Sequence, residues 1–267
     1  MITDPWFYAL AIPALLITSI SKGGFGAGLG VLAVPLIALR LPVAEVTPIL
    51  LPIICLMDAA SLWGYRGRWD GRILAITLPG ALIGIALGAV GVGTLPDVWL
   101  RLAIGTIAVA FPLRRWLAAP RRQRTHEGPG GEGRFSGRRP AQGVFWSFLS
   151  GITSFLANAG GPPFSIYLMT LRLDKTLFVG TTAVFFAVVN FTKLVPFAWL
   201  GLFTRTSLIT SAALSPVALV GIALGFWLHR RLDPALFYRI SFALVFLLGV
   251  RFVWSSAATI LGTAAAG

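Results

Sequence analysis

Apolar segments that recur along the whole chain constrain its fold more than any other feature. Many of them are long enough to supply the roughly 20 residues that an α-helix needs to cross the hydrocarbon core of a bilayer. Only 12% of the residues are charged, and a soluble domain of this length needs about twice that fraction. We therefore expect an all-α polytopic membrane protein, with helical elements at residues 5–21, 28–40, 43–64, 72–94, 97–117, 142–156, 160–172, 175–199, 207–228 and 234–258.

A basic, glycine-rich segment at residues 118–141 divides the apolar chain in two. It carries six arginines and few apolar side chains, so we expect a flexible linker that cannot build a core. The sequence thus predicts three parts: a first transmembrane repeat at 1–117, a linker at 118–141 and a second transmembrane repeat at 142–267.

The two halves share short motifs at a constant spacing. Leu-Arg-Leu at 39–41 recurs at 171–173, and the same spacing aligns Gly28 with Gly160 and Asp58 with Asn190. Such similarity indicates an internal duplication, which is common in transporters.

The distribution of basic residues predicts how the two repeats are oriented. More loop cations fall on the cytoplasmic side if segments 5–40 and 142–172 each enter the membrane and return than if each crosses once. We therefore expect two inverted repeats, each a Gly-broken helical hairpin followed by three transmembrane helices, with linker 118–141 in the cytoplasm. The net charge of +13 is explained by this asymmetry, and nucleic-acid binding is not expected. Because the N-terminus has no basic n-region, we expect no cleavable signal peptide.

A glycine-rich break interrupts the first apolar segment. It contains one cation and four glycines: Lys22, Gly23, Gly24, Gly26 and Gly28. Non-helical backbone at membrane depth persists only where protein or a watery cavity surrounds it, and its amide groups then favour an anion. The alternatives are close helix packing by the glycines and a lysine that snorkels to the interface.

A second break occupies the corresponding place in the other half. Asn158, Gly160 and Gly161 precede Pro162 and Pro163, which suit the first turn of a helix because proline lacks the N–H group. Two helix N-termini after glycine turns would together favour an anion at the membrane midplane.

Two ionisable residues are predicted deep within spans, namely Asp58 and Lys193. Such residues are functional candidates, and each needs a partner. Asp58 could pair with Lys22 or Lys193 in a structural ion pair, or carry a proton that is coupled to transport. Its counterpart Asn190 can form hydrogen bonds but cannot titrate.

The sequence lacks the residues that a metal site, a nucleotide-binding site or an enzyme active site needs. Two histidines and one cysteine cannot assemble a metal site, so no metal and no cofactor are expected. No nucleotide-binding P-loop is present, and no nucleophile–base pair is expected at membrane depth, so we do not expect an enzyme. Gly80, Gly84 and Gly88, mirrored by Gly221 and Gly225, predict close helix packing.

The sequences of the two glycine-containing breaks resemble those of a known protein family. The stretch GGFGAGLGVLAVPL near the start, and NAGGPPF after the basic linker, resemble the TauE/SafE sulfite exporter family over nearly the whole chain. The resemblance implies a bacterial inner-membrane transporter of sulfur-containing anions such as sulfite, sulfonates or related organic acids.

The leading hypothesis is a secondary transporter that exports a small anion by alternating access, with coupling to protons left open. The alternatives are a passive anion channel and, less favoured, a membrane enzyme or assembly factor. The expected partners are the anionic substrate and the lipid bilayer, and a homo-oligomer is left open.

Overall fold

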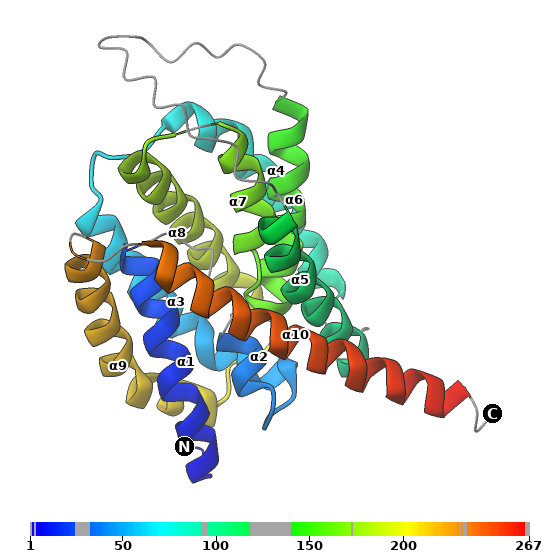
Figure 1. The fold of residues 1–267 in the computed structure, drawn as a ribbon. Coiled ribbons are helices and arrows are strands. Elements are labelled where there is room, and N and C mark those ends of the chain that lie inside the picture. Colours follow the sequence, from blue (N-terminus) through cyan, green and yellow to red (C-terminus); the bar gives the residue numbers. More distant parts are fainter. Residues whose placement is uncertain are drawn as a thin grey trace.

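The protein is helical throughout the part of the chain that the computed structural model describes, which comprises residues 2, 4–24, 33–91, 96–117, 140–171, 173–229, 231 and 234–264 (Figure 1). These residues contain ten helices and no strand, as the sequence predicts. The helices are α1 (Pro5–Gly24), α2 (Ala33–Ile37), α3 (Val43–Gly64), α4 (Gly71–Gly91), α5 (Asp97–Leu117), α6 (Pro140–Ala157), α7 (Gly161–Thr170), α8 (Lys175–Trp199), α9 (Arg205–His229) and α10 (Pro234–Ala264).

Five of these helices are long and apolar enough to cross a membrane, judged on the described residues by length and composition. They cover Pro5–Gly24, Val43–Gly64, Gly71–Gly91, Thr176–Trp199 and Arg205–Leu228. Prolines inside several helices are compatible with this setting, because neighbouring helices can satisfy the backbone groups that a proline frees.

Several predicted boundaries differ from the observed ones; α10, for example, continues to Ala264 instead of ending at residue 258. Two further differences concern the predicted break and the predicted linker. Helix α1 continues to Gly24, so Lys22, Gly23 and Gly24 form its last turn instead of an unwound break. Close packing against α9 favours the helical backbone there, as described below. Helix α6 begins at Pro140, inside the predicted linker. The rest of that linker, residues 118–139, lies outside the described residues, as do Gly26 and Gly28.

Aspartates begin two of the long helices. The Asp174 carboxylate accepts hydrogen bonds from the backbone N–H groups of Thr176 and Leu177 at the start of α8. Asp70 accepts from the N–H groups of Arg72 and Ile73 at the start of α4. Each carboxylate satisfies amide groups that have no partner within the first helical turn.

Helix α1 packs parallel to α9. The Ile2 N–H donates to Thr210 Oγ1 at one end, and a Cβ placed on Gly24 would lie 2.5 Å from the Gly225 carbonyl oxygen at the other. The backbones therefore meet through small residues, as predicted for Gly221 and Gly225.

Helix α6 packs parallel to α4 in the same manner. A Cβ on Gly80 would meet Ser147, and one on Gly88 would meet the Phe155 side chain. A Cβ on Gly84 would collide with the Phe148 carbonyl oxygen. The predicted packing role of these three glycines is confirmed.

Helices α3 and α8 cross in opposite directions at the centre of the molecule. Asn190 of α8 contacts Asp58 near the C-terminal part of α3, whereas Thr181, near the start of α8, bonds to Asp70 just beyond the end of α3. The residue numbers of the contact partners therefore decrease along α8 as they increase along α3 and the residues that follow it. The two helices are antiparallel.

Helices α6 and α7 form a hairpin. The Ser150 hydroxyl donates to the Gly160 carbonyl oxygen near the bend, and Gly143 abuts the Tyr167 ring farther along. With ten residues, α7 is about 15 Å long, roughly half of a hydrocarbon core. The chain therefore turns back after α6 into a helix that is shorter than a membrane span. In Figure 1, α1 begins at the lower end of the view and α6 at the upper end.

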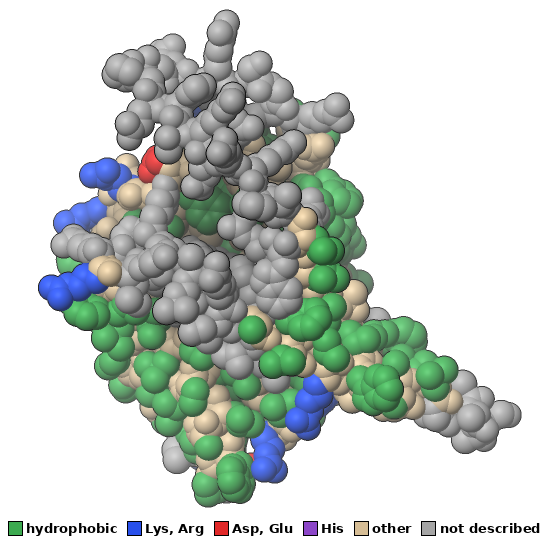
Figure 2. All heavy atoms as spheres, viewed as in Figure 1, with side chains coloured by type: hydrophobic (Ala, Val, Ile, Leu, Met, Phe, Trp, Pro, Cys, Tyr) green, Lys and Arg blue, Asp and Glu red, His purple; other side chains and the backbone are tan. Residues whose placement is uncertain are grey.

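The outer surface is suited to lipid. Apolar side chains cover most of the described surface in Figure 2, while Lys and Arg gather in small groups toward the edges. Five of the exposed tryptophans lie near helix ends, namely Trp6, Trp63, Trp99, Trp199 and Trp227. Tryptophan is enriched at both membrane–water interfaces, so these positions fit the two borders of a bilayer.

Candidate functional site

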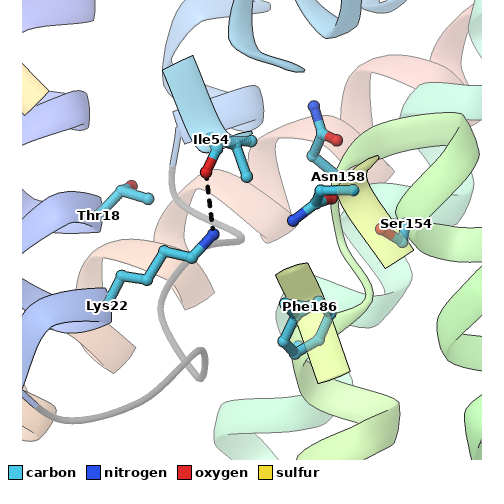
Figure 3. A pocket seen from close by; sticks show the side chains of 8 residues that line it. Thr18, Lys22, Ile54, Ser154, Asn158 and Phe186 are labelled. Atoms are coloured by element: carbon cyan, nitrogen blue, oxygen red, sulfur yellow. Dashed lines mark hydrogen bonds between the residues drawn. The ribbon is translucent and has the colours of Figure 1, made fainter. Parts of the chain in front are cut away.

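A cavity of about 40 Å³ lies between the two halves of the chain (Figure 3). One buried water needs about 10–15 Å³ measured in this way, so the space admits more than a single water molecule. Helices of both halves supply its lining, which consists of Thr18, Lys22, Ile54, Ser154, Asn158, Gly161, Phe186 and Asn190.

Lys22 extends from the last turn of α1 into this space (Figure 3). Its Nζ lies 2.6 Å from Asp58 Oδ1 and 3.5 Å from the Ile54 carbonyl oxygen. Its side chain is 11% exposed, so the ammonium group sits in a largely desolvated place and does not snorkel. Of the two partners considered for Asp58, the structure selects Lys22.

Asp58 is fully buried behind the cavity wall. While Oδ1 faces Lys22, its second oxygen, Oδ2, accepts a hydrogen bond of 2.7 Å from Asn190 Nδ2. The side chain is therefore held by one helix from each half, α1 and α8. Buried carboxylates require such pairing, because an unpaired charge in a low dielectric is costly.

Lys193 is also fully buried, one turn along α8 from Asn190. Its Nζ donates to Asn158 Oδ1 at 2.6 Å, to the Ser154 carbonyl oxygen at 2.9 Å and to Ser154 Oγ at 3.1 Å. These three acceptors satisfy the three N–H bonds of an ammonium group. All three are uncharged, so Lys193 differs from Lys22 in having no carboxylate among its hydrogen-bond partners in the described residues.

Asn158 owes its position to the bend between α6 and α7. Its φ of 50° lies in the left-handed region, which asparagine tolerates better than most residues. The next helix starts at Gly161 with prolines in its first turn, as predicted. Gly160 leaves no room for a side chain, because its Cβ would lie 2.7 Å from the Ser150 carbonyl oxygen.

Two hydrogen-bond donors at the cavity have no partner among the described residues, Thr18 Oγ1 and Asn158 Nδ2. Thr18 is only 3% exposed. A buried hydroxyl or amide without a partner costs about 1–3 kcal/mol, so each is a reason to expect something that accepts a hydrogen bond.

The charges around the cavity do not cancel. With both lysines protonated and Asp58 ionised, Lys22, Lys193 and Asp58 together carry one net positive charge. Together with the two open donors, this cavity offers both hydrogen bonds and positive charge. The described residues contain no group of three or more potential His, Cys, Asp or Glu ligands for a metal ion.

The structure brings most of the predicted site residues together, but not all. Lys22, Asn158, Gly161 and Asn190 line the cavity, and Asp58 and Lys193 bond to residues that do. Gly23 and Gly24 instead face the backbone of α9, Gly160 faces α6, and Pro162 is buried in the first turn of α7. Gly26 and Gly28 lie outside the described residues.

Four lining residues were not identified from the sequence: Thr18, Ile54, Ser154 and Phe186. A signal for three of them was available in the internal duplication. The spacing of 132 residues that aligns Asp58 with Asn190 also aligns Lys22 with Ser154 and Ile54 with Phe186. Extending that alignment from the polar pair would have completed most of the lining.

Comparison with protein families gives a match over most of the chain. A family model described as sulfite exporter TauE/SafE matches residues 11–252, a range that includes every described residue of the cavity. No curated protein and no solved structure matches the chain.

Proposed function

Because the chain belongs to the TauE/SafE sulfite exporter family, a family of membrane transporters and not of enzymes, we propose that it is a secondary transporter of small sulfur-containing anions. The anion is sulfite, a sulfonate or a related organic acid, and it is exported across the bacterial inner membrane by alternating access.

One observation carries the choice of binding site: a largely buried lysine lines a cavity with two unpartnered donors, and a buried carboxylate and a second buried lysine bond to residues of its wall. Sulfite and sulfonate oxygens accept hydrogen bonds and carry negative charge, so they match Lys22, Thr18 and Asn158. In a water-poor cavity each of these contacts is stronger than at an exposed surface. We assign the substrate to this cavity and not to Gly23 and Gly24, which face the backbone of α9.

We further propose that the chain consists of two inverted repeats, 1–117 and 142–267, joined by a cytoplasmic linker. The antiparallel crossing of α3 and α8 at the aligned pair Asp58 and Asn190 supports this relation. So does the exchange of partners, in which α1 packs on α9 as α6 packs on α4. A two-fold axis in the membrane plane generates both patterns, and rocking about a site on that axis provides alternating access.

Flux through purified protein in liposomes tests the function. With sulfite as the probe, we expect saturable uptake that is accelerated when the vesicles are preloaded with sulfite, because a carrier returns faster when it is loaded. A passive anion channel would show no such acceleration and would contradict alternating access.

A charge-matched double variant tests the site. Lys22→Met with Asp58→Asn removes one charge of each sign, so the net charge at the cavity stays at +1 while the Lys22 donor is lost. We expect sulfite flux to fall at least tenfold. The control is Arg66→Met, which removes an exposed cation in the loop after α3 and should leave flux unchanged. Full flux in the double variant would rule out this cavity as the site.

A further inference from the structure

We propose that the cavity accepts one net negative charge, and that Asp58 sets this limit. A monoanion enters alone, whereas a dianion enters only together with one proton, which Asp58 takes up. This inference rests on the proposed anion site and assigns Asp58 as the residue that selects among anions by charge.

The argument starts from the charges that face Asp58 from each neighbouring helix. Lys22 approaches from α1, and Asn190 and Lys193 belong to α8. On α3 itself, Cys55 is a neutral thiol one turn away. Neither α6 nor the middle of α9 contains an ionisable residue. With both lysines protonated and Asp58 ionised, these groups carry a net charge of +1.

The part of the chain that follows α1 does not change this count. Residues 25–32 read Phe-Gly-Ala-Gly-Leu-Gly-Val-Leu and contain no ionisable side chain. The sum of +1 thus holds whatever course that segment takes.

An anion that enters competes with Asp58 for Lys22. The Lys22 ammonium group is the one charged donor that both lines the cavity and pairs with the carboxylate among the described residues. A monoanion brings the total charge to zero. A dianion would leave one uncompensated negative charge in a desolvated site, which is costly. A proton from bulk water that binds to the Asp58 carboxylate removes this excess, and Asn190 can still bond to the neutral acid.

Two probes of similar size that keep their charge through the neutral pH range separate these cases: methanesulfonate, a monoanion, and sulfate, a dianion. Calorimetric titration of the full-length protein in buffers of different ionisation enthalpy measures protons taken up on binding. We expect no proton with methanesulfonate and one proton with sulfate. The Kd for sulfate should then fall about tenfold for each unit that the pH is lowered, while the Kd for methanesulfonate stays constant.

Asp58→Asn makes the charge +2 and removes the proton acceptor. We expect this variant to bind sulfate without proton uptake, and the ratio of sulfate to methanesulfonate affinity to rise roughly tenfold or more above that of the unmodified protein at neutral pH. Asn158→Asp supplies the comparison, because a carboxylate next to Lys193 makes the charge zero and should weaken both probes.

The outcomes distinguish this inference from the proposed function. Binding of sulfate to the unmodified protein without proton uptake, or an unchanged affinity ratio in Asp58→Asn, overturns the charge limit but leaves the anion site standing. If neither probe and no sulfite binds to the unmodified protein, the proposed site itself is wrong. Should Asp58→Asn fail to fold, the proton count on the unmodified protein still decides.

Discussion

Lys22 and Asp58 form a buried ion pair that joins α1 to α3, with 2.6 Å between Lys22 Nζ and Asp58 Oδ1. The pair stands beside the cavity, so the same lysine stabilises a buried carboxylate and is available to a ligand. Its two roles predict different responses to mutation, and these can be separated.

Stability should respond to the pair in a non-additive way. Lys22→Met leaves the Asp58 carboxylate buried without its cation and should lower the free energy of unfolding by about 3–5 kcal/mol. The double variant Lys22→Met with Asp58→Asn leaves no charge unpaired at this position and should recover most of that loss. Thermal unfolding of the purified single and double variants in detergent measures the cycle, and additive losses would mean that the two groups do not depend on each other.

Thr18 should matter for binding but not for folding. Its buried hydroxyl has no partner among the described residues, so Thr18→Val removes an unsatisfied group while keeping the shape of the side chain. We expect the free energy of unfolding of the variant to be unchanged or slightly higher. The anion affinity should fall roughly tenfold or more, because a hydrogen bond to a charged ligand contributes about 1.5–3 kcal/mol.

The control for Thr18 is Thr77→Val. Thr77 is equally buried, but its hydroxyl already donates to the Ile73 carbonyl oxygen within α4, a helix that supplies no residue to the cavity lining. This variant should bind sulfite with the original affinity. Equal loss of affinity in both variants would assign the effect to general loosening of the helices.

Close-packed glycines should affect stability in proportion to the space beside them. Gly84→Ala and Gly24→Ala place a methyl group against the backbone of a neighbouring helix, so we expect a loss of about 1–3 kcal/mol in each. Gly91→Ala, at the end of α4, meets nothing within 4 Å and should be neutral. Thermal unfolding compares the three. A Gly24→Ala variant that is as stable as the unmodified protein but binds sulfite more weakly would show that Gly24 contributes to anion binding.

Accessibility of single cysteines tests the orientation of the repeats. In a Cys55→Ser background we expect Arg66→Cys and Arg134→Cys to be protected from an impermeant thiol reagent in intact cells, because both lie on the predicted cytoplasmic side. Thr206→Cys, an exposed position at the start of α9, should be labelled. Labelling of Arg134→Cys together with protection of Thr206→Cys would reverse the proposed topology.

Sequence periodicity and composition were sufficient for the helical class and for most helix positions. Long apolar runs leave few alternatives, because a chain in lipid must satisfy its backbone within each segment. The packing glycines were predictable for a related reason, since small residues at a spacing of four allow helices to approach closely.

The end of α1 was harder to predict. Glycine is a poor helix former, so Gly23 and Gly24 suggested an unwound backbone. In the structure, the contact with Ile222 and Gly225 of α9 holds them in helical form. Propensity is local, whereas this contact joins residues about 200 positions apart. The partner of Asp58 was left open for the same reason, because two lysines were available and only the packing of α1 on α3 selects Lys22.

The contact between Asp58 and Asn190 shows what a single chain permits that two identical chains do not. In a dimer of half-length chains, symmetry would place the same residue on both sides of the crossing of α3 and α8. Two carboxylates at 2.7 Å could not both remain ionised, and two amides would carry no charge. Fusion of the halves allows one carboxylate and one amide to face each other. The centre of a nearly symmetric protein can then hold a single carboxylate. Once the two positions had diverged, neither half could rebuild this centre from a copy of itself.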